Sequence, residues 1–364
     1  MKTRELGQLH EIDLTDPTDP IELVEEGYRR GWAADGLPVV LPTEERVREF
    51  VDRAGRDPGE VIGGVPERRR EVTVGKAAAN AVMAGCLPEY FPVVLAACEA
   101  MFTPEFNPVG PFSSMGGSAI LVIVNGPIRR TIDLNCRNNI FGPGWRANAT
   151  IGRAIRLIQM NSCASIPGVF DRSTLGHPGK YSYCIGEDEE NSPWEPFHVD
   201  RGFDREESVV TVFAAEGPRQ VRNSGSARPE GVLYAVADVL ASQGTSLATS
   251  GSVASTPNGL RLGETAVVMA QEHRDVISAA GWTKADVRDY LFEHATRSLA
   301  DLKRTAQLPG EIAPGDEAVP VRVVEDPRDI FLLAGGGSEG GMTAVIPAWG
   351  AKAHSVAVSR KVRG

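Results

Sequence analysis

Uninterrupted runs of hydrophobic residues predict the β-strands of this chain. The clearest run is Ala119-Ile-Leu-Val-Ile-Val124, which predicts a strand that is buried on both faces. Shorter or alternating runs predict the remaining strands, at residues 37–41, 71–74, 208–215, 265–269, 329–334 and 354–359.

Between these strands, hydrophobic residues recur every three or four positions, which is the spacing of a helix that buries one face. The segment 147–161 follows this pattern at Ile151, Ala154, Ile155 and Ile158. The segment 89–101 is apolar nearly all round, so we expect it inside the core. Further helices are predicted at residues 44–51, 76–84, 229–242, 270–280 and 284–303. Thr283 and Asp286 resemble a capping box at the start of the last of these helices, with Asp in place of Glu or Gln.

Strands that alternate with helices indicate an α/β fold. We expect mixed or mainly parallel sheets in two lobes. Two lobes are expected because a domain has roughly 150 residues and the chain has 364. The predicted organisation is an N-terminal arm over residues 1–36, a first lobe over 37–215 and a second lobe over 216–364.

The segment 162–205 has little periodicity and many Gly, Pro and polar residues. A loop of this length inside a compact chain is usually functional or disordered, and its six aromatic residues argue against disorder. We therefore interpret it as a long irregular site loop within the first lobe.

The charge balance excludes some classes of partner. Lys and Arg number 38 against 48 Asp and Glu, a net charge of −10, so the basic surface of a nucleic-acid-binding protein is not expected. No apolar stretch approaches the roughly 20 residues of a membrane helix. The polar N-terminus lacks a secretion signal, and five cysteines without a CxxC pair are typical of free thiols in a reducing compartment. We expect a cytoplasmic protein.

A Gly/Pro-rich segment, Phe141-Gly-Pro-Gly-Trp-Arg146, leads into the predicted helix 147–161. Asn148 is the expected N-cap, and the free N–H groups at a helix start bind anions, with Arg146 beside them. We predict that Arg146 and Asn148 bind a carboxylate or phosphate of the substrate. The alternative is an ordinary cap with a surface arginine.

The segment 177–198 places a thiol, imidazoles, an ammonium and carboxylates within 22 residues. Cys184, His198 and Glu190 could supply a nucleophile, a base and an orienting group, and Lys180 would favour a thiolate or bind substrate. A metal site at His177, Cys184 and His198 is weaker, because their spacing matches no metal motif, and we predict none. The alternative is a solvated acidic surface loop that has no role in a site.

Asp133-Leu-Asn-Cys-Arg-Asn138-Asn139 follows the buried strand 119–124. Polar side chains after a core strand often reach the ligand, so Asn138 is a predicted substrate-binding residue and Cys136 a second candidate thiol. An Asn-rich turn explains the same residues without a ligand.

The Gly-rich segment 334–341 formally contains GxGxxG after a strand, but only five residues separate it from Pro347. This is too short for the helix of a dinucleotide-binding unit. We expect no NAD, NADP or FAD, and no cofactor of another kind.

Three stretches resemble an uncharacterised bacterial protein family that is associated with UGSC-motif (seleno)proteins. They are Asp35-Gly-Leu-Pro-Val-Val40 with Pro42-Thr43, Asn80 to Tyr90, and Arg146 to Arg153. The chain has no Cys-Gly-Ser-Cys in place of the motif. The family carries no settled reaction, so the resemblance implies a bacterial protein of one continuous architecture and no catalytic residues.

Taken together, these features predict an enzyme that acts on a small anionic, carboxylate-bearing metabolite. Lyase or hydrolase chemistry by a thiol or by acid/base groups fits the absence of cofactor motifs. The alternative is a non-catalytic or half-site subunit whose loop 162–205 docks a redox or (seleno)protein partner. We expect a homo-oligomer in either case.

Overall fold

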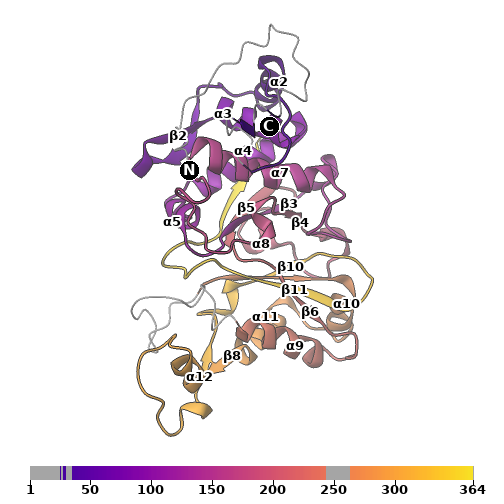
Figure 1. Cartoon of the computed structure of the whole chain (residues 1–364). Coiled ribbons are helices and arrows are strands. Elements are labelled where there is room, and N and C mark those ends of the chain that lie inside the picture. The colour runs from indigo at the N-terminus through magenta and orange to yellow at the C-terminus, as the bar shows by residue number, and fades with distance from the viewer. Residues whose placement is uncertain (1–24, 26–27, 30–34, 243–262, 364) are drawn as a thin grey trace.

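The computed structural model describes residues 25, 28, 29, 35–242 and 263–363. They form four layers: helices, a first sheet, a second sheet and a second set of helices (Figure 1). The predicted α/β class is confirmed, and both large sheets are mixed. Most of the predicted arm 1–36 lies outside the described residues.

The first sheet has the strand order β12-β5-β3-β4, with β3 at Ala119–Asn125 and β4 at Cys184–Gly186 parallel. β5 (Val209–Ala215) runs antiparallel to β3 and to β12 (Val358–Lys361). β12 therefore joins the first sheet although it belongs to the sequence range of the predicted second lobe.

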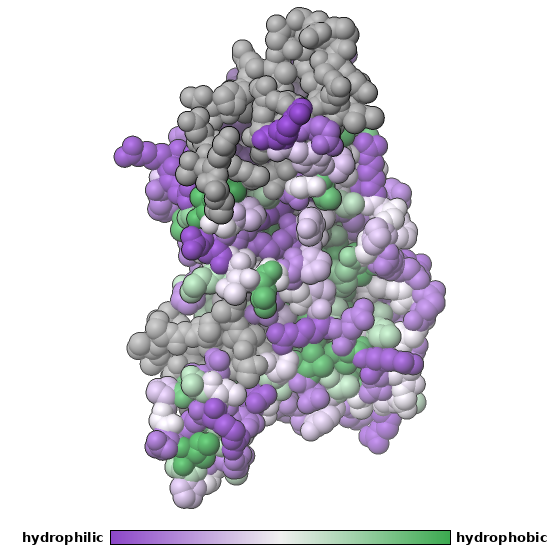
Figure 2. All heavy atoms as spheres, viewed as in Figure 1, coloured by the Kyte–Doolittle hydropathy of each residue, from purple (hydrophilic) through white to green (hydrophobic). Residues whose placement is uncertain are grey.

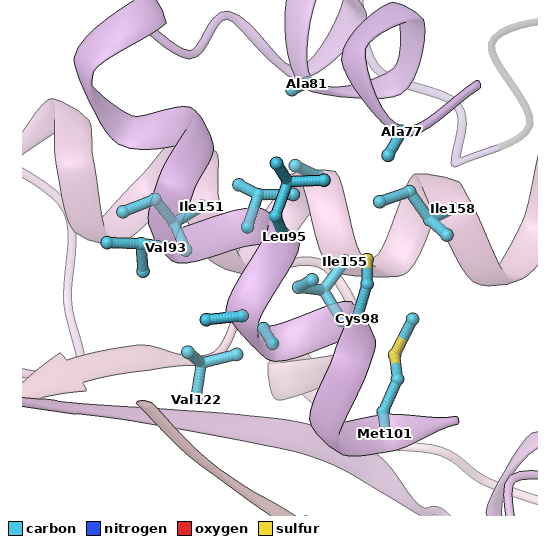
Figure 3. Close-up of a cluster of buried hydrophobic side chains, with 14 of the residues drawn as sticks. Ala77, Ala81, Val93, Leu95, Cys98, Met101, Val122, Ile151, Ile155 and Ile158 are labelled. Carbon is cyan, nitrogen blue, oxygen red and sulfur yellow. The ribbon is translucent and has the colours of Figure 1, made fainter. Parts of the chain in front are cut away.

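Helices cover the outer face of this sheet. α4 (Phe91–Met101) packs on β5 and β12, and α7 (Arg146–Leu157) packs on β3 and β4. α3 (Val74–Ala84) lies against α7, and α2 (Glu44–Ala54) against α3. Figure 3 shows the apolar core between these helices and the sheet. α4 is buried at every residue except Glu99, as its uniform hydrophobicity predicts.

The second sheet has the order β10-β7-β11-β6. β7 (Thr265–Met269) and β10 (Ile330–Ala334) are parallel, whereas β11 (Met342–Pro347) runs antiparallel to β7 and β6 (Arg219–Arg222). α9 (Pro229–Ala241), α10 (Gln271–Ala279) and α11 (Lys284–His294) cover its outer face.

The two sheets pack face to face through a shared apolar core. Leu121 and Ile123 of β3 face this core, while their neighbours Ile120, Val122 and Val124 face the helices of the first layer. Because side chains alternate along a strand, the all-apolar run of β3 serves both cores.

Short elements complete the fold. β1 (Val61–Val65) pairs with β2 (Arg70–Thr73), and β8 (Thr296–Ser298) pairs with β9 (Pro320–Arg322). The other α-helices of the described residues are α5 (Val109–Ser113), α6 (Ile128–Thr131), α8 (Phe197–Asp200) and α12 (Leu299–Arg304).

Several local predictions differ from the structure. The strand predicted over 354–359 begins only at Val358 and runs to Lys361. Residues 37–41 form no strand, and the helix predicted over 284–303 is broken by β8 into α11 and α12. The predicted site loop 162–205 is irregular for most of its length but contains β4 and α8. β4 has only three residues, which is too short for a hydrophobic pattern.

Candidate functional site

A groove of about 700 Å³ lies between the end of the predicted site loop and the start of α11. This volume is within the roughly 300–1,000 Å³ of small-molecule sites. Its walls are residues 192–195, Asp200 and Arg205 on one side, and Ser278, residues 281–285 and Arg288 on the other.

The groove carries one excess positive charge, because Arg205, Lys284 and Arg288 line it together with only Glu195 and Asp200. Lys284 Nζ lies 2.5 Å and Arg288 Nη2 2.7 Å from the same oxygen, Asp200 Oδ2. Two cations thus share one carboxylate oxygen. In a protein of net charge −10, this is a local attraction for anions.

The start of α11 positions both cations. Thr283 and Asp286 form the predicted capping box, so the helix begins at Lys284. Arg288 follows one turn later on the same face, because residues four apart on a helix are neighbours. Arg288 Nε also donates to the Ile330 carbonyl at 3.0 Å, and Lys284 Nζ to the Glu195 carbonyl at 2.9 Å.

Two tryptophan residues line the groove. Trp194 is buried and its Nε1 donates to the Trp282 carbonyl at 3.3 Å. The Trp282 ring packs edge-on against Tyr290, with centroids 5.6 Å apart. Of the two, Trp282 is the more exposed beside the cations of the groove.

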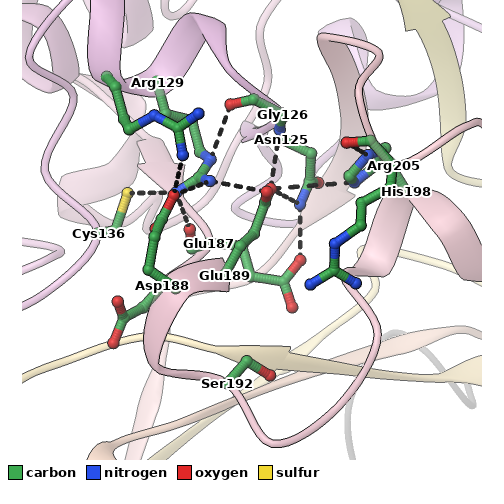
Figure 4. A network of polar contacts seen from close by, with 12 residues as sticks. Asn125, Gly126, Arg129, Cys136, Glu187, Asp188, Glu189, Ser192, His198 and Arg205 are labelled. Atoms are coloured by element: carbon green, nitrogen blue, oxygen red, sulfur yellow. Dashed lines mark hydrogen bonds and ion pairs between the residues drawn. The ribbon is translucent and has the colours of Figure 1, made fainter.

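Behind the groove, an acidic cluster follows the carboxyl ends of the parallel strands β3 and β4 (Figure 4). Arg129 Nη2 lies 2.7 Å from Glu189 Oε2 and 3.0 Å from Glu190 Oε1. Burial alone would raise the pKa of Glu190, but its hydrogen bond and attraction to Arg129 lower the pKa to about 2. Glu190 is therefore ionised and held by arginine.

Glu187 is the buried centre of the acidic cluster. Its carboxylate accepts from Asn125 Nδ2 at 2.6 Å, Phe197 N at 2.7 Å and Ala334 N at 3.2 Å, and so joins the two sheets. Burial raises the pKa of Glu187. The positive charge of Lys284 and the three hydrogen-bond donors lower it, but by less than burial raises it. We interpret Glu187 as a structural carboxylate.

Asp188 and Arg274 form a second link between the layers. Arg274 Nη2 lies 2.8 Å from Asp188 Oδ2, and Arg274 is fully buried. Arg274 Nη1 also donates to the Met269 carbonyl at 2.9 Å, and the Asp188 N–H donates to the Ala334 carbonyl at 2.8 Å. The acidic run of the sequence is thus largely packed rather than solvated.

The structure does not bring the predicted catalytic trio together. Cys184 lies in β4 with its side chain in the helix-side core, and no described hydrogen bond or ion pair joins it to His198 or Glu190. His198 is fully buried, and its Nε2 contacts the Arg205 carbonyl. Its Nδ1 lies 3.9 Å from Glu189 and has no hydrogen-bond partner among the described residues. Only His198 and Glu190 reach the acidic cluster.

Cys184 is expected to be unreactive in the folded protein. It is 5% exposed and burial raises the pKa of its thiol well above the ordinary value. Iodoacetamide should label Cys184 only after unfolding, because the thiolate is the reactive form. Mass spectrometry of labelled peptides, with and without urea, measures this. Rapid labelling of the native protein, with a pH midpoint below the free-thiol value of about 8.5, would restore Cys184 as a nucleophile.

The prediction that Asn148 is the N-cap of α7 is wrong. α7 begins at Arg146 with Trp145 as its N-cap, so Asn148 lies inside the first turn and is buried. Both ends of its amide are used: Oδ1 accepts from the Asn135 N–H, and Nδ2 donates to the carbonyls of Asn135 and Cys184. The Arg146 guanidinium is exposed and donates to the Gly85 carbonyl at 2.9 Å.

The two other predicted binding residues are also engaged. Asn138 is exposed, and its amide donates to the Glu339 carboxylate of the Gly-rich segment. That segment leads into strand β11 rather than a helix. Lys180 pairs with Asp171, 2.8 Å away, on the helix side of the first sheet. None of Arg146, Asn148, Asn138 and Lys180 lines the groove.

The sequence interpretation missed Lys284, Arg288 and Trp282. The capping box at Thr283 marked the helix start, and a Lys and an Arg four residues apart in its first turns were the available signal. Their partner Asp200 is more than 80 residues away in the sequence, so the pairing itself has no local pattern.

No group of three or more His, Cys, Asp or Glu side chains in the described ranges is arranged to hold a metal ion. Among the same residues, no helix has the length and apolar character needed to cross a bilayer. Figure 2 shows one face of the molecule, where hydrophobic residues lie in small groups among hydrophilic ones.

No protein-family model matches the chain, and no curated protein is significantly similar to it. The function is therefore inferred from the geometry of the groove.

Proposed function

We propose that the protein is an enzyme that binds a small carboxylate-bearing metabolite in the groove between residues 192–205 and the start of α11. The observation that supports this most is the shared Asp200 carboxylate, which leaves Lys284 and Arg288 with charge and donors for a second anion. A ligand carboxylate would complete this pairing, and Trp282 would contact the apolar part of the ligand.

For the chemical step we propose acid/base catalysis of the lyase or hydrolase type. Glu195 is the groove carboxylate with the most freedom, because its pairing with Arg205 is solvent-exposed while Asp200 is held by two cations. We assign proton transfer to Glu195. A thiol mechanism through Cys184 is less favourable because of its burial in the core.

Turnover tests this proposal. The purified protein is incubated with a small-molecule extract of bacterial cells, and the mixture is followed by mass spectrometry. We expect one carboxylate-bearing compound to be consumed without added dinucleotide or metal, and Glu195→Gln to slow its consumption by roughly 100-fold or more. No consumption of any compound would contradict an enzymatic function.

One observation favours the alternative, docking of a redox or (seleno)protein partner by the loop 162–205. Leu175 and Met115 are 96% and 75% exposed, and the Thr174 N–H donates to the Met115 carbonyl, so these apolar residues are carried by adjacent backbone segments. Exposed apolar groups of this kind mark partner surfaces when they are extensive. Here they are few, so the enzyme remains our first proposal.

A further inference from the structure

The ring of His198 is fully buried, and both of its nitrogens face groups that only accept hydrogen bonds. Nε2 lies 3.2 Å from the Arg205 carbonyl, and Nδ1 lies 3.9 Å from Glu189 Oε1 (Figure 4). A neutral imidazole has one donor and one acceptor nitrogen. The carbonyl requires the donor at Nε2, so a neutral ring would turn the lone pair of Nδ1 toward Glu189. An imidazolium donates from both nitrogens and avoids this conflict.

Glu189 is held as an ionised carboxylate. Its Oε1 accepts from Asn125 Nδ2 at 2.9 Å and from Gly126 N at 2.8 Å, and its Oε2 lies 2.7 Å from Arg129 Nη2. Donors thus contact both oxygens, as an acceptor-only group requires. The group that faces Nδ1 of His198 therefore carries a negative charge.

The charge of the acidic cluster also favours an imidazolium. The cluster contains three carboxylates and two guanidinium groups, those of Glu187, Glu189, Glu190, Arg129 and Arg130. Lys284 attracts Glu187 from the groove side, but it is already paired with Asp200. A buried charge without a counter-charge is costly, and a proton on His198 balances the excess carboxylate.

The nearest further carboxylate already has a cation. Glu207 pairs with Lys361, whose hydrogen bond lowers the pKa of Glu207, and the charge of His198 acts in the same direction. On α8 itself, the Arg201 guanidinium donates to the Ala357 carbonyl at 2.7 Å. Glu189 is therefore the counter-ion available to His198.

His273 shows the neutral alternative. It is also buried, with Nε2 2.9 Å from the Asn223 carbonyl and Nδ1 2.8 Å from Thr343 Oγ1. A hydroxyl can donate, so a neutral ring satisfies both contacts. Burial lowers the pKa of His273, which favours the same form. The two histidines differ in one partner, a carboxylate for His198 and a hydroxyl for His273.

His198 connects its charge to one wall of the groove. The segment 198–205 carries Asp200 and Arg205, which both line the groove. It folds back on His198, because Nε2 contacts the Arg205 carbonyl and the Phe203 N–H donates to the His198 carbonyl at 3.1 Å. One ring thus joins both ends of the segment to the acidic cluster.

We propose that His198 is a buried imidazolium that positions the groove wall at residues 198–205, with Glu189 as its counter-ion. This inference rests on the proposed function, because it assigns a proton-dependent hold to the wall that carries Asp200 and Arg205. As pH rises, the ring loses the Nδ1 proton and its attraction to Glu189, and the wall loosens. His198 does not line the groove, so it is a positioning residue.

Nitrogen NMR of the full chain with isotope-labelled histidine tests the charge without a ligand. The two ring nitrogens resonate close together in an imidazolium and far apart in a neutral ring. Near neutral pH we expect the first pattern for His198 and the second for His273. Each signal is assigned by its loss in His198→Gln or His273→Gln. A neutral pattern for His198 would overturn the proposal.

Hydrogen exchange of the wild type tests the positioning and needs no variant. Protection of peptides from residues 198–205, corrected for the intrinsic exchange rate, should fall roughly tenfold or more between about pH 6 and about pH 9. Protection of α9 should stay constant. His198→Gln keeps a side-chain donor but has no charge, so its wall should be weakly protected at both pH values. Protection of the wild-type wall that is independent of pH would refute the positioning role.

Stability provides a matched comparison of the two histidines. An imidazolium favoured by the fold stabilises the protein at low pH, and this contribution is lost as pH rises. The Tm difference between wild type and His198→Gln should therefore shrink from about pH 6 to about pH 9. For His273→Gln it should shrink in the opposite direction, as pH falls. The same direction for both variants would contradict the proposal. None of these measurements uses a ligand, so their failure is distinguishable from a failure of the proposed function.

Discussion

Replacing Arg274 by methionine should lower the free energy of unfolding by roughly 3–5 kcal/mol. The substitution leaves the Asp188 carboxylate buried without its cation and the Met269 carbonyl without one donor. An uncompensated buried charge is among the most destabilising single changes. We expect a fall in Tm of roughly 5–15 °C, measured by calorimetry, with denaturant unfolding to give the free energy.

Two variants separate this effect from a general loss of arginine. Arg304 pairs with Asp301 and Glu317 at the surface, so Arg304→Met should leave the free energy of unfolding close to that of the wild type. The double variant Arg274→Met with Asp188→Leu removes both charges and should recover part of the loss. If Arg274→Met were as mild as Arg304→Met, Arg274 would not join the two layers as described.

Replacing Lys284 by methionine should weaken binding of the carboxylate-bearing ligand by roughly ten- to a hundredfold, since a charge-assisted hydrogen bond contributes about 1.5–3 kcal/mol. Asp200 keeps Arg288 as its partner, so the fold should survive. Lys303→Met is the matched control, because Lys303 lies 2.7 Å from Asp316 with similarly low exposure but outside the groove. Equal affinity in wild type and Lys284→Met would remove Lys284 from the site.

The strands and helices that could be predicted are those whose sequence alone carries a hydrophobic or capping pattern. The strand at residues 119–124 and the strand at 265–269 were predicted because both faces of each are buried and every residue except Thr265 is apolar. The capping box at Thr283 has a fixed spacing and was also predicted. β6 was not predicted, because its residues are polar and exposed except Val221.

The candidate site was less predictable, because its contacts are long-range and made by long side chains. Lys284 and Arg288 meet Asp200 only when the second sheet packs on the first. Conversely, Asn148 has the sequence context of a helix start, but only the structure shows that its amide is consumed by Asn135 and Cys184. The same holds for Cys184, whose burial depends on α7 and β3.

Several predictions stay untested by the geometry. They are the resemblance to the family associated with UGSC-motif (seleno)proteins, the cytoplasmic location and the homo-oligomer. Turnover and oligomeric state in solution address the function and the assembly independently of the groove.

The most direct measurement of the central claim is equilibrium dialysis of the protein against a bacterial small-molecule extract, with the retained compounds identified by mass spectrometry. Our account predicts that wild type and Lys303→Met retain the same carboxylate-bearing compound, and that Lys284→Met and Arg288→Met lose it while remaining folded by circular dichroism. Retention of that compound at equal levels by all four proteins would contradict the account, because the ligand would then bind outside the groove.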